Sequence, residues 1–178
     1  MQLWYAPASP FARKVRVVAH ERGLWERVGL VEVNPWTDPD LRQVNPLAKV
    51  PAPRTDDGTL LYESAVICDY LDALAGPRAL HPQDGPRRWQ ALVLQGLADG
   101  AATAAGRLFA DERRPADERS PAMMERFRLA IDAAADDLEA RTLPQADITI
   151  GEIAAAVFLG YLDFRWPERS WRGTRPRL

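Results

Sequence analysis

The feature that most constrains the fold is a change of pattern at residues 75–86, AGPRALHPQDGP. Before this Gly- and Pro-rich stretch, short strand patterns alternate with helical patterns, and after it only helical patterns occur. Stretches of this composition are typical of domain boundaries. The sequence therefore predicts an α/β domain over residues 1–75, a linker over 76–86 and an all-helical domain over 87–178.

The first domain is expected to begin with a β-α-β unit. Strand patterns cover residues 2–5 and 27–33, and residues 10–22 between them carry apolar side chains at helical spacing. Residues 34–46 are rich in Asn and Pro and leave room for one helical turn. A strand, a helix and a second strand in this order predict a parallel pair.

The end of the first domain predicts a hairpin and a helix. Residues 49–64 read as two short β segments around Asp57-Gly58, which is a strong turn signal. Residues 64–74 read as a helix that ends before Gly76-Pro77. Because a hairpin is antiparallel, the sheet of this domain should be mixed.

The second domain is expected to contain long helices. Residues 120–140 begin at a Ser-Pro pair that favours a helix start. Residues 86–109 carry a helical apolar face, which consists of Trp89, Leu92, Val93, Leu97, Ala104 and Leu108. Residues 149–164 are apolar nearly all round, which predicts the central buried helix of this domain.

The last predicted helix has a start signal, and the stretch that follows has no pattern. Thr149 and Glu152 have the spacing of a capping box. The final residues, RWPERSWRGTRPRL, are rich in Arg and Pro, and we predict no secondary structure for them.

Composition excludes several classes of protein. A formal net charge of −2 argues against general affinity for nucleic acid or for an anionic membrane. No apolar run has membrane-spanning length, and the start lacks the pattern of a signal peptide. Cys68 is the one cysteine, and His20 and His81 lie far apart, so neither a disulfide framework nor a metal site is expected. We expect a cytoplasmic protein.

Ser9 stands where the first strand gives way to a helix. Serine is a favoured N-cap and proline a favoured first helical residue, so Ser9-Pro10 reads as a cap. A hydroxyl at a helix N-terminus can also serve catalysis, because the helix dipole favours negative charge there. The two roles are compatible.

The pair Glu63-Ser64 also stands at the start of a helix, the last helix of the first domain. Ser64 can cap that helix and Glu63 can favour its dipole, or both can bind a ligand. Cys68, one turn further on among apolar residues, reads as a buried structural thiol and not as a nucleophile.

Four segments, in order along the chain, resemble the cytosolic glutathione S-transferases, and in particular bacterial members with an active-site serine. These segments are YAPASPFARKVR, NPLAKVPA, LLYESAVICDYLD and TIGEIAAAVFLGYLDFRWP. The resemblance implies a thioredoxin-like N-terminal domain and an all-α C-terminal domain. It also implies a homodimer that uses glutathione as co-substrate, without a further cofactor, to conjugate a hydrophobic electrophile.

The resemblance assigns the principal site residues. Ser9 would stabilise the glutathione thiolate, which lowers the pKa of the thiol and raises the concentration of the nucleophile. The Val50-Pro51 peptide bond would be cis, with the Val50 backbone pairing with the cysteinyl part of glutathione. Glu63 and Ser64 would bind the ammonium and carboxylate of the γ-glutamyl part.

Four further residues are weaker candidates. Lys49 would contact the glycyl carboxylate, and Arg13 would add positive potential beside Ser9 or be a solvated helix residue. Phe11 lies in the same first turn. Asp99 would reach glutathione across a dimer interface or be a solvated or interface aspartate.

The sequence departs from the family pattern at two places. Pro53 has no backbone N–H to donate to a neighbouring strand. Its strand should therefore be locally distorted, or the position should face no hydrogen-bond partner. The chain also stops at Leu178, where family members usually continue with helices that wall the electrophile pocket. A shortened C-terminal domain favours an alternative function, a non-catalytic glutathione-binding or protein-interaction module of the same fold. A third alternative is a cysteine-dependent thiol transferase or reductase. This function needs a nucleophilic cysteine at the first helix, and the serine at position 9 argues against it.

Overall fold

The computed structural model describes residues 1–77, 80–141 and 147–178. The described chain divides into two compact units, Met1–Arg88 and Trp89–Leu178. Residues 78–79 of the expected linker and residues 142–146 of the expected helical domain lie outside the described residues.

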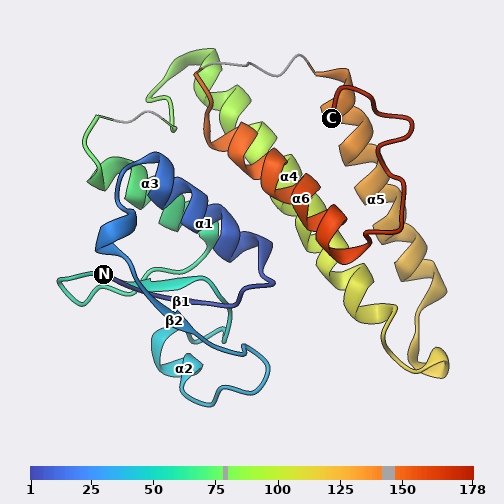
Figure 1. Cartoon of the computed structure of the whole chain (residues 1–178), viewed down its shortest axis with the longest axis horizontal. Helices are drawn as coiled ribbons and strands as arrows, with labels where there is room; N and C mark the ends of the chain where they lie inside the picture. Colours follow the sequence, from blue (N-terminus) through green and yellow to red (C-terminus); the bar gives the residue numbers. More distant parts are fainter. Residues whose placement is uncertain (78–79, 142–146) are drawn as a thin grey trace. The chain divides into compact units, whose positions relative to one another are not determined.

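A mixed sheet forms the centre of the first unit. Strand β1 (Gln2–Tyr5) lies between β2 (Gly29–Glu32), to which it is parallel, and β3 (Ala52–Arg54), to which it is antiparallel. Figure 1 shows α1 (Pro10–Glu21) and α3 (Ser64–Leu74) side by side above the strands. This is the thioredoxin-like arrangement, and it confirms the predicted mixed sheet.

The connections between these elements are short. A 3-10 turn, η1 (Trp25–Arg27), precedes β2, and the predicted single helical turn is α2 (Leu41–Val44). Helix α3 has the bounds that the sequence predicts, since Ser64 opens it and Gly76 with a φ of 106° follows its end.

The second half of the predicted hairpin is not a strand. Beyond β3 the pairing consists of one isolated bridge between Arg54 and Leu60, and the Leu61 amide donates to the Pro53 carbonyl over 3.0 Å. The N–H and C=O of one strand residue point to the same side. Pro53 therefore has no donor to return a bond to Leu61, which is the local distortion that its proline predicts.

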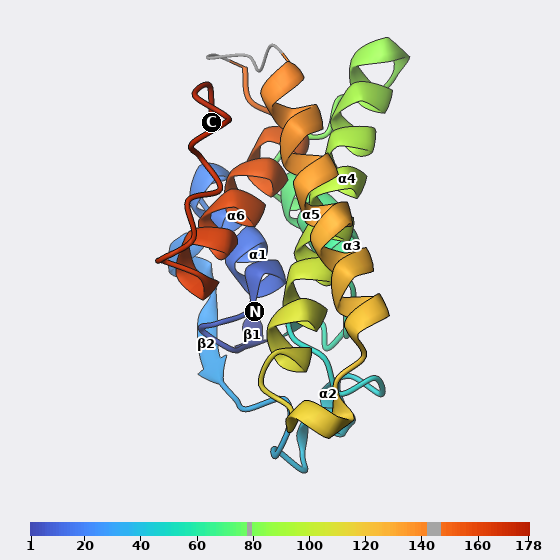
Figure 2. The same ribbon diagram turned by 90° about the vertical axis from the view of Figure 1, so that its right-hand side faces the viewer.

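The second unit is helical. It contains α4 (Gly85–Asp111, whose first turn belongs to the first unit), α5 (Pro121–Ala140) and α6 (Ile150–Arg165), with a short 3-10 turn, η2 (Ala116–Glu118), before α5. Figure 2 shows these helices from the side. Helix α6 is buried over most of its circumference, with Ile150 and Phe158 fully buried, which confirms its prediction as the central helix.

The predicted apolar face of α4 is buried in part, with Ala104 and Leu108 buried and two of its larger residues exposed. Trp89 and Val93 are 64% and 59% exposed. The buried face consists mainly of small residues, because α6 approaches closely: a Cβ on Gly151 would lie 2.8 Å from the Ala91 carbonyl oxygen. The small buried residues of α4 are Ala91, Ala98, Ala101, Ala102, Ala104 and Ala105.

The capping box at the start of α6 is confirmed. The Glu152 carboxylate accepts the Thr149 amide over 2.7 Å, and the Thr149 hydroxyl accepts the Gly151 amide over 3.2 Å. Ser120 occupies the N-cap position of α5, but its side chain makes no capping hydrogen bond. None of the helices among the described residues combines the length and apolarity that a bilayer crossing requires.

The segment after α6, residues 166–178, contains no helix or strand, as predicted, yet ion pairs fix it to the helices. Arg175 is buried, and its Nε donates to Asp136 over 2.7 Å while its Nη2 lies 3.4 Å from Asp132. The Arg177 amide donates to Glu139 over 3.0 Å. In Figure 1 this red segment follows α5, which carries all three acidic residues.

Two further carboxylates hold the first half of this segment. Glu112 accepts from the Trp166 indole and from Arg169, each over 2.8 Å. Asp163 accepts from the Trp171 indole and from Arg172, again over 2.8 Å. Each carboxylate therefore fixes one tryptophan and one arginine of the segment.

The pKa values of both carboxyls lie below their ordinary values. Burial raises the pKa of Glu112, but hydrogen bonds from Arg169 and Trp166 and the charges of Arg169 and Arg128 outweigh this effect. The hydrogen bond from Arg172 lowers the pKa of Asp163 more than burial raises it, and Trp171 adds to the lowering. A carboxyl with a lowered pKa in the folded state stabilises the fold above its ordinary pKa, and the contribution is lost as the pH falls.

We therefore expect acid to weaken the attachment of residues 166–178. The wild-type melting temperature should fall as the pH drops below about 4.5, and a Glu112→Gln variant should show a smaller fall over the same range. Thermal unfolding at pH 7 and at pH 4 measures the difference. Glu118→Gln, at an exposed position of η2, is the matched control and should follow the wild type. Parallel curves for all three proteins would contradict the role of Glu112.

Candidate functional site

Ser9 is the N-cap of α1, as predicted. Its hydroxyl oxygen accepts the Ala12 amide over 3.2 Å, and Pro10 takes the first helical position. The side chain is half-buried. A hydroxyl has one donor besides its acceptor sites, so the capping bond leaves the Ser9 proton available to a ligand at the helix N-terminus.

The topology of the first unit brings the predicted site residues to one edge of the sheet. Trp4 lies opposite Ala52. The end of β1, from which the chain continues to Ser9, therefore lies beside the start of β3. Strand β3 directly follows Pro51. The chain after Leu60 runs antiparallel to β3 and returns to this level at Glu63. The N-termini of α1 and α3 therefore lie at the same edge.

The Val50-Pro51 peptide bond is cis, which confirms the prediction. Val50 is half-buried and Pro51 is buried. Both precede the first paired residue of β3, so Val50 lies at the sheet edge where the Ser9 loop also lies.

Asn45 holds the loop that leads to the cis peptide bond. Its side chain is buried, and the amide nitrogen donates to the Lys49 carbonyl over 2.9 Å while the amide oxygen accepts from Leu47 over 3.0 Å. Between them, Ala48 has a φ of 50°, in the left-handed region. The signal in the sequence is Asn45-Pro46, since Asn before Pro favours turns.

Glu63 and Ser64 lie at the N-terminus of α3, as predicted. Glu63 has a φ of 65° and a ψ of 122°, a conformation that costs a non-glycine residue about 1–3 kcal/mol. Ser64 is the first residue of the helix and is 5% exposed. Strained backbone of this kind concentrates at ligand sites, where the surrounding structure holds it in place.

Lys49 and Glu63 connect two of these segments. The Lys49 Nζ lies 3.8 Å from a Glu63 carboxylate oxygen, and both side chains are mostly exposed. An exposed pair of this kind adds little to stability. It does show that the loop before Val50 and the start of α3 lie next to each other, with one cation and one anion available to a zwitterionic ligand.

The remaining candidates are placed as follows. Phe11 is half-buried and Arg13 is exposed, both in the first half of α1. Asp99 is half-buried in the middle of α4, in the second unit. Their roles stay predictions.

Cys68 is fully buried inside α3, as predicted for a structural thiol. Among the described residues, no group of three or more histidine, cysteine, aspartate or glutamate side chains is placed to hold a metal ion. The polar groups that the structure brings to this edge include the Ser9 and Ser64 hydroxyls, the N-termini of α1 and α3 and the exposed Lys49–Glu63 pair.

Known proteins with this sequence pattern identify the family. Residues 8–74 match the family model of the glutathione S-transferase N-terminal domain. Over its whole length the chain is 31% identical to the uncharacterized GST-like protein YibF of Escherichia coli (strain K12), of which the match covers 90%. The chain belongs to the glutathione S-transferase family.

Solved structures of glutathione S-transferases agree with this result. A family member from Pseudomonas fluorescens Pf-5, with bound glutathione, is 40% identical and has a TM-score of 0.93 over 99% of this chain and 89% of that one. A glutathione S-transferase from Methylobacillus flagellatus KT, also with glutathione bound, is 33% identical and has a TM-score of 0.89 over 98% of this chain and 89% of that one.

Proposed function

We propose that this glutathione S-transferase binds glutathione along the edge formed by Ser9, Val50, Glu63 and Ser64. Two relatives of the same fold hold glutathione in their crystal structures, which supports this ligand. The observation that carries the proposal is the meeting of the Ser9 cap, the residues before β3 and the start of α3 at one sheet edge.

The three parts of glutathione match the groups at this edge. The γ-glutamyl carboxylate would lie at the N-terminus of α3, where the Ser64 amide and hydroxyl can donate and the helix dipole favours an anion. The γ-glutamyl ammonium would pair with Glu63, and the glycyl carboxylate with Lys49. The Val50 backbone would pair with the cysteinyl backbone.

In this arrangement the cysteinyl sulfur would lie at the N-terminus of α1. The Ser9 hydroxyl would donate to the thiolate, and the positive end of the helix dipole would stabilise the charge. The thiolate would then attack an electrophilic carbon of a hydrophobic substrate, forming a C–S bond and expelling the leaving group with its electron pair.

The proposal also includes a cytoplasmic homodimer. Trp89 and Val93 support the dimer, because large apolar side chains that are exposed together on one helix face mark interaction surfaces.

Calorimetric titration with glutathione tests the binding site. The wild type should bind saturably, and Ser64→Ala and Glu63→Gln should each weaken binding at least about tenfold. Ser64→Ala removes a hydrogen bond to the ligand carboxylate, and Glu63→Gln removes the negative charge that pairs with the ligand ammonium. Glu26→Gln changes an exposed glutamate of η1 and is the control, with unchanged affinity.

The same titration, combined with an assay of turnover, separates the enzyme from the non-catalytic module. Saturable binding without turnover of any electrophile would favour the non-catalytic module over the enzyme. An absence of binding by a folded wild-type protein would overturn the glutathione site itself.

A further inference from the structure

The exposed Lys49–Glu63 pair is the ion pair that a bound glutathione would have to change. The Lys49 Nζ lies 3.8 Å from a Glu63 carboxylate oxygen. In the proposed complex, Glu63 takes the γ-glutamyl ammonium and Lys49 takes the glycyl carboxylate, which are the two ends of the ligand. Two side chains that lie together in the free protein would therefore bind opposite ends of one molecule.

The length of glutathione decides whether the pair can stay closed. An extended chain advances about 3.3–3.6 Å per residue and the γ-linkage adds two bonds, so the charged ends of extended glutathione lie more than about 10 Å apart. Hydrogen bonds of ordinary length on either side of a 3.8 Å pair span that distance only if all four charged groups lie nearly in one line. The pair should therefore open when the ligand binds.

The backbone on each side of the pair is fixed. The Asn45 side chain donates to the Lys49 carbonyl over 2.9 Å, and the Ile67 amide donates to the Glu63 carbonyl over 3.0 Å. Opening is therefore a movement of the two side chains, and the four-carbon stem of lysine is flexible enough to turn its ammonium toward a new partner.

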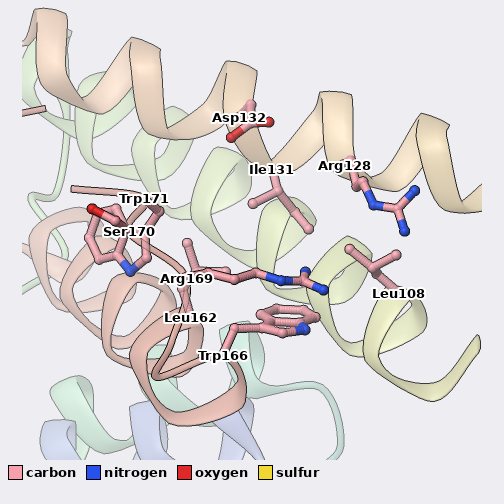
Figure 3. A pocket seen from close by; sticks show the side chains of 9 residues that line it. All are labelled: Leu108, Arg128, Ile131, Asp132, Leu162, Trp166, Arg169, Ser170 and Trp171. Carbon is pink, nitrogen blue, oxygen red and sulfur yellow. The ribbon is translucent and has the colours of Figure 1, made fainter. Parts of the chain in front are cut away.

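The ion pairs of the second unit show how a fixed pair differs from this one. Figure 3 shows Arg169 across the face of the Trp166 ring, and its guanidinium donates to Glu112, which is 15% exposed, over 2.8 Å. The Lys49 and Glu63 side chains are 67% and 63% exposed, and among the described residues neither forms a second ion pair. A pair this exposed is weak enough for charged ligand groups to replace it.

We propose that the Lys49–Glu63 pair is a switch that selects thiols with a charge at both ends, an inference that rests on the proposed glutathione site. In the free protein Lys49 competes with the ligand ammonium for Glu63. Glutathione replaces the pair completely, because its glycyl carboxylate takes Lys49 as its ammonium takes Glu63. A ligand without the glycyl charge must break the pair and leaves Lys49 to water.

Calorimetric titration of the whole chain at low ionic strength, with glutathione and with its glycyl ethyl ester, tests the switch. The wild type should bind glutathione about threefold or more tightly than the ester, which has no glycyl charge. Lys49→Met should remove this preference. It should also bind the ester about two- to fivefold more tightly than the wild type does, because no pair has to be broken.

Two further variants are the controls. Arg27→Met removes an exposed positive charge at the opposite edge of the sheet, since Gly29 pairs with Gln2 at the start of β1, and should leave both affinities unchanged. In a Glu63→Gln background there is no pair to break. Adding Lys49→Met to that background should therefore leave the ester affinity unchanged.

The direction of the ester result separates the switch from other roles of Lys49. An ester affinity that Lys49→Met leaves at the wild-type value would mean that Lys49 contacts the glycyl carboxylate without competing for Glu63. Equal weakening of both ligands would mean that Lys49 stays beside Glu63 in the complex. Either result overturns the switch and leaves the glutathione site standing, whereas a folded wild type that binds no glutathione overturns the site itself.

Discussion

The Ser9→Ala variant is expected to conjugate glutathione about a hundredfold more slowly than the wild type, because removing one preorganised donor to a catalytic anion costs this much in related settings. Ser9 is the N-cap of α1, and its proton remains available after the capping bond to Ala12. Without the hydroxyl, the pKa of the bound glutathione thiol should rise toward its value in water. Less thiolate is then present at neutral pH.

Two measurements separate this role from simple capping. Turnover gives the rate, and ultraviolet absorbance of the thiolate in the complex gives the pKa of the bound thiol. Loss of a cap alone costs about 1 kcal/mol of stability and should not move that pKa.

The controls follow from the structure. Ser9→Thr keeps a capping hydroxyl and should retain most of the activity. Thr149→Ala removes the cap of α6 and should lower stability while leaving the thiol pKa unchanged. If Ser9→Ala keeps wild-type turnover and thiol pKa, Ser9 is a cap and nothing more.

The sequence predicts the elements that local patterns determine. Helix α3 is predicted with the observed bounds because Ser64 opens it and Gly76 follows it, and the capping box of α6 is visible as Thr149 and Glu152. The site segments are also local: a Ser-Pro start, a Val-Pro pair and a Glu-Ser pair each occupy adjacent residues. Their meeting at one sheet edge follows once the strand pairing is known.

What the sequence does not reveal depends on distant partners. The C-terminal segment has no periodicity, and it takes its path from ion pairs and hydrogen bonds with residues such as Asp136, 39 positions away. Trp89 and Val93 fit a helical apolar face, but the close approach at Gly151 selects the small residues of α4 for the core. Hydrophobic pattern alone cannot distinguish a face that packs within the chain from one left exposed.

Asp72 is a further residue whose contribution to stability depends on distant partners. It is fully buried in α3 and forms an ion pair with the Arg22 Nε over 2.8 Å. Its carboxylate also accepts the His81 amide over 2.8 Å and the Leu80 amide over 3.2 Å. One carboxylate thus joins the end of α1, helix α3 and the start of the described chain after residue 79.

The Asp72→Ala variant should lose about 3–5 kcal/mol of unfolding free energy, because removing one partner of a buried pair leaves the other charge and its donors unsatisfied. The Arg22 side chain is 14% exposed, and the Leu80 and His81 amides are buried. The stability of a whole domain is about 5–15 kcal/mol, so this single change approaches the limit for folding. Urea denaturation followed by circular dichroism measures the loss.

Graded variants identify the cause of that loss. Asp72→Asn keeps an acceptor for the Leu80 and His81 amides but removes the charge, so it should be less destabilised than Asp72→Ala. Combining Asp72→Leu with Arg22→Met removes both charges and should cost less than the sum of the two single changes, which a double-mutant cycle detects. Glu26→Ala, at an exposed position, should stay within about 0.5 kcal/mol of the wild type. If the two single losses simply add, the Asp72–Arg22 pair is not coupled, and the stabilising role of Asp72 lies in its bonds with the Leu80 and His81 amides and with the His81 ring.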